Sequence, residues 1–76
     1  MPSFGVLLKR YRIATGLSQE ALAERANIST RAVSDLERGI NQAPRSATLD
    51  ALLQALALSE EQRQALIAAA RASALT

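Results

Sequence analysis

The sequence predicts an all-α domain of five short helices, and three observations support this. Hydrophobic residues form 49% of the 76 positions and recur at the three- and four-residue spacing of helices, with no alternating strand pattern. They are mostly Ala and Leu with only 3% aromatic residues, which suits closely packed short helices. The breaks between the patterns carry Ser, Gly and Asn, residues that begin and end helices. We expect one domain over residues 1–76, with helices at about 4–15, 18–26, 29–38, 46–57 and 60–72.

Each predicted helix turns one apolar face inward and has recognisable end signals. The inward residues are Phe4, Leu7, Leu8, Tyr11, Leu22, Ala23, Val33, Leu36, Leu49, Leu52, Leu53, Leu56, Leu66, Ile67 and Ala70. Four serines precede helices and are expected to cap them: Ser18, Ser29, Ser46 and Ser59. The segment S-E-E-Q at 59–62 has the pattern of a capping box. Gly16, Asn27 and Gly39 are placed to end helices in a left-handed conformation.

The composition excludes several classes of function. The chain has no cysteine and no histidine, so disulfides, thiol chemistry, zinc fingers and histidine-based catalysis are all excluded. It has no Gly-rich phosphate loop and no convincing carboxylate constellation. We therefore expect no enzymatic activity, no metal and no cofactor. No apolar run of 18 residues and no secretory signal is visible, so we expect a cytoplasmic protein that does not enter a membrane.

Charge is distributed unevenly along the chain. The formal net charge is only +2. Through residue 45, seven basic residues outnumber four acidic ones, whereas the remainder carries two basic and three acidic residues. The excess of positive charge in the N-terminal part favours a polyanionic partner there, although a solvated surface would show a similar difference.

The stretch 18–39 contains two short helices where one long helix could have formed. An α-helix fits the major groove of DNA, and a second helix joined by a tight turn can brace it there. Such a unit needs a small residue at the helix contact, a turn residue that tolerates positive φ, and apolar anchors. Ala23, Asn27 and then Ile28, Val33 and Leu36 meet these needs in order. The remaining face of the second helix is polar and consists of Thr30, Arg31, Ser34, Asp35 and Arg38.

Residues 7–58 resemble the helix-turn-helix domain of the phage repressor/Cro-like family, also called XRE-type. The resemblance rests on G-L-S-Q at 16–19, L-A at 22–23, L-E-R-G at 36–39 and the Pro-x-x-x-T-L spacing from Pro44 to Leu49. It implies a lambda-repressor-like DNA-binding fold in which the second and third helices form the helix-turn-helix unit. The sequence is also similar to the N-terminal domain of larger bacterial transcription regulators, so we expect it to be a piece of a longer chain, with a short Cro-like repressor as the alternative.

The resemblance implies roles for individual residues. Thr30, Arg31, Ser34 and Asp35 match base-reading positions. Positions that contact the DNA backbone are matched by Gln19, Ser29, Arg38, Ile40, Asn41, Gln42 and Arg45. Arg12 and Glu37 match a charge pair that ties the first helix to the reading helix. Independently of the family, the forked guanidinium of Arg31 can donate to O6 and N7 of guanine together.

Two positions depart from the family pattern. Asn27 replaces the usual turn glycine. Asp35 places a carboxylate among the reading residues, where it can accept a hydrogen bond from cytosine N4, pair with Arg31 or Arg38, or repel phosphate.

The sequence therefore favours a sequence-specific double-stranded DNA-binding module of a bacterial or phage transcription regulator, located at the nucleoid. We expect it to work as a homodimer on paired half-sites, because one reading helix covers few base pairs. No small-molecule ligand is indicated for this domain. The alternative is an adaptor that keeps the fold but binds a protein partner, which Asp35 and the low net charge would suit.

Overall fold

The molecule is a bundle of five helices, as predicted. The structure, a computed structural model, describes residues 2–40 and 44–74, and it contains no strand in those ranges. The helices are α1 (Phe4–Thr15), α2 (Gln19–Ala26), α3 (Thr30–Arg38), α4 (Ser46–Leu56) and α5 (Glu60–Ala74). The all-α prediction is confirmed.

The helix ends differ from the predicted bounds by one or two residues, mainly because of capping. Ser18 and Ser29 lie just outside α2 and α3, where their hydroxyl oxygens accept hydrogen bonds from the amides of Ala21 and Ala32, both at 3.0 Å. The predicted capping box is present, since Ser59 and Gln62 exchange two hydrogen bonds of 3.2 Å.

The expected cap at Ser46 is wrong. The carbonyl of Arg45 already accepts the first helical hydrogen bond of α4, from the amide of Leu49 at 2.9 Å. Arg45 is therefore the N-cap residue and Ser46 lies inside the first turn, with no side chain capping the helix. The first amides of α4 lack the partner that serines supply to α2 and α3.

Four helices end in a left-handed residue. Gly16, Asn27 and Gly39 have φ values of 81°, 57° and 80°, in agreement with the sequence signals. Ala57, which ends α4, has a φ of 51° and was not predicted to do so. Its side chain makes this conformation costly, because the Cβ atom crowds the backbone.

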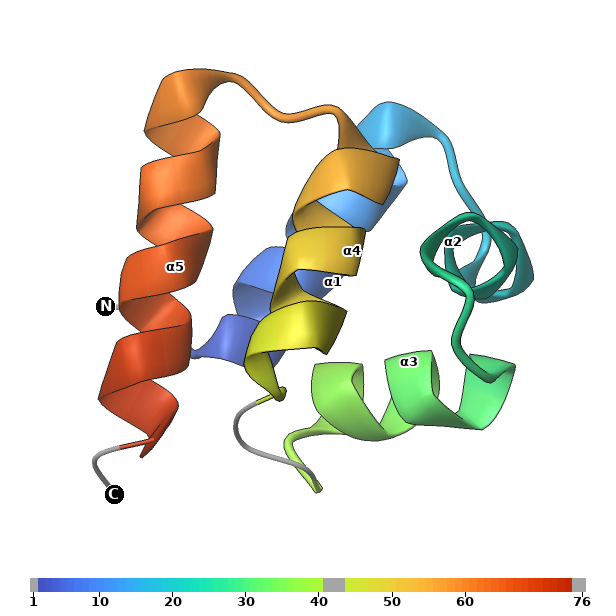
Figure 1. The fold of residues 1–76 in the computed structure, drawn as a ribbon, viewed down its shortest axis with the longest axis horizontal. Helices are drawn as coiled ribbons and strands as arrows, with labels where there is room; N and C mark the ends of the chain where they lie inside the picture. Colours follow the sequence, from blue (N-terminus) through green and yellow to red (C-terminus); the bar gives the residue numbers. More distant parts are fainter. Residues whose placement is uncertain (1, 41–43, 75–76) are drawn as a thin grey trace.

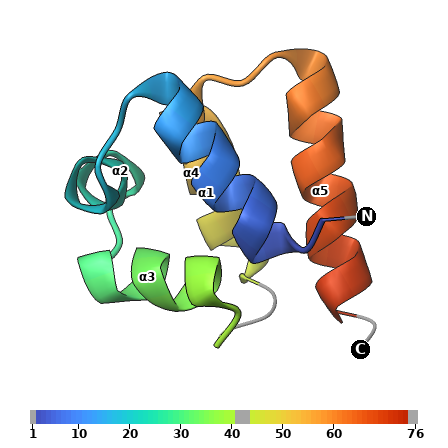
Figure 2. The same ribbon diagram turned by 180° about the vertical axis from the view of Figure 1, so that it is seen from behind.

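Helix α1 lies at the centre of the molecule, and α3 lies across one end of the bundle (Figures 1 and 2). α1 packs against α3, α4 and α5, whereas α2 packs against α3 and α4. One core joins all five helices. It consists of Phe4, Leu7, Leu8, Leu22, Ala23, Ala26, Val33, Leu36, Leu52, Leu53, Leu56, Leu66, Ala69 and Ala70. Leu49, Ile67 and Tyr11, which were predicted to face inward, are only partly buried at its edge.

Gly5 permits the closest approach between α1 and α3. A Cβ atom at this position would lie 2.4 Å from the carbonyl oxygen of Leu36 and 2.8 Å from that of Glu37. These distances are far below a van der Waals contact, so any side chain here would push the two helices apart. Gly5 thus sets the depth at which the C-terminal half of α3 sits on α1.

Candidate nucleic-acid interface

Helix α3 presents a polar face and is anchored by an apolar one. Val33 and Leu36 are buried in the core. On the other side of the helix, Thr30, Arg31 and Arg38 are exposed. Ser34 and Asp35, on the same side, are half-buried. The five polar residues predicted to lie together on one face of the helix therefore do so.

The turn between α2 and α3 is closed by backbone hydrogen bonds. The amide of Ile28 donates to the carbonyl of Ala23 at 2.9 Å, and the amide of Asn27 donates to that of Glu24 at 3.2 Å. Asn27 takes the left-handed conformation that this closure needs, and the side chain of Ile28 packs against the core. The asparagine that replaces the family glycine thus forms the same kind of helix end.

A partly buried polar network connects α3 to the two preceding helices. The carboxylate of Glu37 accepts hydrogen bonds from Nε of Arg12 at 2.6 Å and from Nη2 of Arg12 at 3.0 Å. It also accepts one from Nε2 of Gln19 at 3.0 Å. Nη1 of Arg12 donates to the carbonyl of Leu17 at 2.9 Å. The side chains of Arg12 and Glu37 are only 12% and 3% exposed, so the charges compensate each other away from water.

The protonation of Arg12 follows from this arrangement. Its hydrogen bonds to Glu37, assisted by the charge of that carboxylate, raise the pKa of Arg12 above its ordinary value, although burial acts in the opposite direction. A group whose pKa is raised by folding stabilises the fold at every pH below its ordinary pKa. This stabilisation is lost only as the pH rises through the raised pKa. Arg12 therefore remains charged throughout the neutral range.

The second charge pair lies on the exposed face of α3. Nε of Arg31 is 3.9 Å from Oδ2 of Asp35, one helical turn further along. The side chain of Arg31 is 90% exposed and that of Asp35 is 21% exposed. Of the pairings left open by the sequence, the structure contains the one with Arg31, and Arg38 forms no ion pair with any residue that is described.

The residues predicted to contact the DNA backbone differ in whether their hydrogen-bonding groups are already occupied within the protein. Gln19 is the first residue of α2, but its carboxamide already donates to Glu37. The amide of Ile40 is also occupied, because it donates to the carbonyl of Asp35 at 3.0 Å. The side chains of Arg38 and Arg45 are exposed. Asn41 and Gln42 lie outside the described residues.

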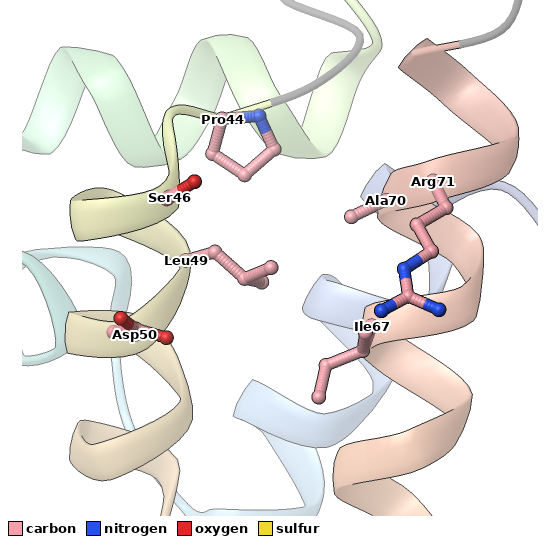
Figure 3. Close-up of a pocket in the computed structure, with 7 residues that line it drawn as sticks. All are labelled: Pro44, Ser46, Leu49, Asp50, Ile67, Ala70 and Arg71. Atoms are coloured by element: carbon pink, nitrogen blue, oxygen red, sulfur yellow. The ribbon is translucent and has the colours of Figure 1, made fainter.

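A groove separates α4 from α5 (Figure 3). It has a volume of about 350 Å³ and is lined by Pro44, Ser46, Leu49, Asp50, Ile67, Ala70 and Arg71. Leu49 and Ile67 face each other across it, which explains why both are only partly buried. Asp50 and Arg71 lie on opposite walls, and neither forms an ion pair with a described residue.

Sequence reasoning missed several of these features. The hydrogen bond from Gln19 to Glu37, the helix contact at Gly5 and the groove were not predicted. Gly5 did leave a signal, because a glycine inside a helical pattern often marks a close backbone approach. In the groove, the acidic and basic residues next to predicted core positions, Asp50 after Leu49 and Arg71 after Ala70, offered a weaker one.

Two short helices joined by a tight turn, with the second anchored inward and polar outward, define a helix-turn-helix unit. A family model described as a helix-turn-helix domain matches residues 3–66. The chain belongs to this family, and the match agrees with its resemblance to the repressor/Cro-like proteins. A search of curated proteins and a search of solved structures each found no match.

No helix of the described part combines the length and apolar character needed to cross a membrane. The same residues contain no group of three or more acidic, histidine or cysteine side chains arranged to hold a metal ion.

Proposed function

We propose that this chain is the sequence-specific double-stranded DNA-binding module of a bacterial or phage transcription regulator, acting at the nucleoid. The observation that carries the proposal is the presentation of α3. Its exposed arginines stand on a helix whose opposite face is buried and whose orientation is fixed by Glu37. A helix of this kind enters the major groove with its side chains already directed outward.

Within this proposal the residues of α3 divide between two roles. Arg31 and Thr30 would meet base edges, assisted by Ser34 and Asp35. Arg38 would contact the backbone together with Arg45, and the amides at the start of α2 and α3, near Gln19 and Ser29, lie at helix N-termini that attract phosphate. Base contacts supply the sequence preference and backbone contacts supply most of the affinity.

The test is selection from a randomised duplex pool at two salt concentrations, with Arg31→Ala and Arg38→Ala. We expect an enriched motif whose preference relaxes in Arg31→Ala. Arg38→Ala should weaken binding to all sequences alike and reduce the salt dependence by about one released ion. Arg63→Ala, on α5, is the matched control and should change neither. Weak binding without an enriched motif would contradict the proposal and would favour the alternative, a protein partner for the same face.

For the state of assembly, the proposal is a homodimer that uses the groove between α4 and α5. A patch that carries one acid and one base, Asp50 and Arg71, neither of which pairs with a described residue, would be complementary to its own copy after a two-fold rotation. Leu49 and Ile67 would supply the apolar contact between them.

Charge exchange tests this dimer. Asp50→Arg and Arg71→Asp should each abolish dimerisation, measured by sedimentation on DNA with paired half-sites, because each places like charges together. The double variant should restore it. A wild-type chain that occupies only single half-sites as a monomer would refute the dimer while leaving the DNA-binding proposal intact, and a double variant as defective as the single ones would show that the groove takes another occupant.

A further inference from the structure

Under the proposed function, Asp35 is the acidic residue on the face of α3 that would meet DNA. Each phosphate in the duplex repels it, so the carboxylate lowers affinity rather than raising it. Its contact with Arg31 across 3.9 Å does not account for it as a stabiliser of α3, because Arg31 is 90% exposed. Exposed pairs at this spacing shift the folding equilibrium by only about two-fold, and the order of base before acid is the less favourable one.

The contact with Arg31 suggests a different role. A free arginine at this position can donate to phosphates as well as to bases, and on a phosphate its charge carries no sequence information. A carboxylate one turn away, with Oδ2 at 3.9 Å from Nε, attracts the guanidinium toward α3 and repels the DNA backbone. Asp35 pairs with Arg31 and not with Arg38, although Arg38 lies three residues further on, has the same chemistry and is also exposed.

We infer that Asp35 is a positioning residue that directs the guanidinium of Arg31 to a guanine edge and makes α3 selective for that base at the expense of affinity. This inference rests on the proposed function of α3 and names the specificity of the same site. Arg31 supplies two parallel donors for O6 and N7 of guanine, and Asp35 contributes only through the placement of Arg31.

The experiment compares base preference with affinity in four variants: Asp35→Asn, Arg31→Ala, the double variant, and Glu61→Gln. Each is taken through the same duplex selection and then titrated against the best site and against sites with the guanine replaced. Asp35→Asn keeps the shape of the side chain and removes its charge. Glu61→Gln, exposed on α5, removes one negative charge elsewhere. Thermal unfolding verifies that each variant is folded.

The wild type should prefer guanine at one position of each half-site by roughly ten-fold or more. Asp35→Asn should reduce this preference at least three-fold and tighten binding to the replaced sites, whereas Glu61→Gln should leave the preference unchanged. In the double variant the preference at this position should be no flatter than in Arg31→Ala alone, because Asp35 acts through Arg31.

The outcomes separate the two proposals. A wild-type motif whose guanine preference survives Asp35→Asn overturns the positioning role and leaves the proposed function standing. A loss of preference at a different position, persisting when Arg31 is absent, would show that Asp35 reads a base of its own and overturns it equally. If the wild type enriches no motif, the proposed function fails and this inference fails with it.

Discussion

The two halves of the molecule differ in how well their helix ends are stabilised. In the α2–α3 half, both helices begin under a serine cap, end in a residue suited to positive φ, and connect to α1 through Glu37. Helix α4 has neither kind of end. It begins at Arg45 without a side-chain cap and ends at Ala57 in a left-handed conformation. Beside it, the groove toward α5 remains open.

This difference indicates where the fold needs rigidity. A reading helix must hold its orientation within narrow limits, because displacement of the base-contacting side chains costs specificity. The ends of α4 carry no such demand. The missing cap and the left-handed alanine each cost only a small amount of folding free energy, so the fold tolerates them. Arg45, which occupies the capping position, also has a candidate role in DNA contact. Substitutions at Glu37, Ala57 and Arg45 each remove or add one of these caps, helix ends or polar contacts.

The largest effect is expected for Glu37→Ala. This change leaves the guanidinium of Arg12, only 12% exposed, without its charge partner, and removes the acceptor of Gln19. Removal of one partner from a buried ion pair costs about 3–5 kcal/mol, which is a large part of the stability of a small domain. Urea unfolding followed by circular dichroism measures the loss. Glu24→Ala, exposed on α2, is the control. A loss below about 1 kcal/mol would mean that the pair behaves as a surface pair.

Gly5→Ala should have the next largest effect. The added Cβ atom meets two backbone carbonyls of α3, which cannot rotate away as a side chain would. Overpacking of this kind costs about 1–3 kcal/mol. The same unfolding measurement tests it, with Val6→Ala on the exposed side of α1 as the control. Because the helices must separate, DNA affinity should also fall. Stability equal to that of the wild type would show that α1 has room to shift on α3 without cost.

Sequence reasoning predicted the parts of this half that depend on neighbouring residues. The spacing of Val33 and Leu36, the caps at Ser18 and Ser29, and the positive φ of Asn27 are all consequences of local stereochemistry, and the structure contains them. The family resemblance supplied the Arg12 and Glu37 pair, which lies 25 residues apart in the chain. Composition and periodicity alone carry no information about such a contact.

The features that were missed depend on how separate helices are placed. Gly5 meets a carbonyl of α3 that is 31 residues away in the sequence, and the groove needs the gap between α4 and α5. Ser46 shows the same limit on a smaller scale. Its residue type favours a cap, but Ser46 is the first residue of the helix and Arg45 occupies the capping position, which a pattern of residue types does not resolve.

Ala57→Gly should stabilise the fold by about 1 kcal/mol. Glycine removes the strain of a left-handed alanine, which costs roughly 1–2 kcal/mol, and part of this gain is offset by greater freedom of the unfolded chain. The matched control is Ala68→Gly, exposed inside α5, where the same substitution should destabilise by about 1 kcal/mol. Thermal unfolding of the two variants gives shifts of opposite sign. A loss of stability in both would show that α4 ends in another way in solution.

The smallest effect on stability is expected for Arg45→Ser, which gives α4 the kind of cap that α2 and α3 already have. A serine in this position should stabilise the helix by about 0.5–1 kcal/mol, since its hydroxyl can accept from an unpaired amide of the first turn. Under the proposed function, DNA affinity should move in the other direction, with a salt dependence lower by about one ion, because an exposed cation proposed to contact the DNA backbone is lost.

The changes in stability and in DNA affinity of Arg45→Ser, taken together, show why α4 lacks a side-chain cap. Higher stability with weaker DNA binding would mean that α4 tolerates an unsatisfied end so that Arg45 can reach phosphate. Arg63→Ser, on α5, should leave DNA binding unchanged and controls for the loss of one positive charge. Higher stability with undiminished affinity would remove Arg45 from the DNA contacts and leave the uncapped end as a plain local cost.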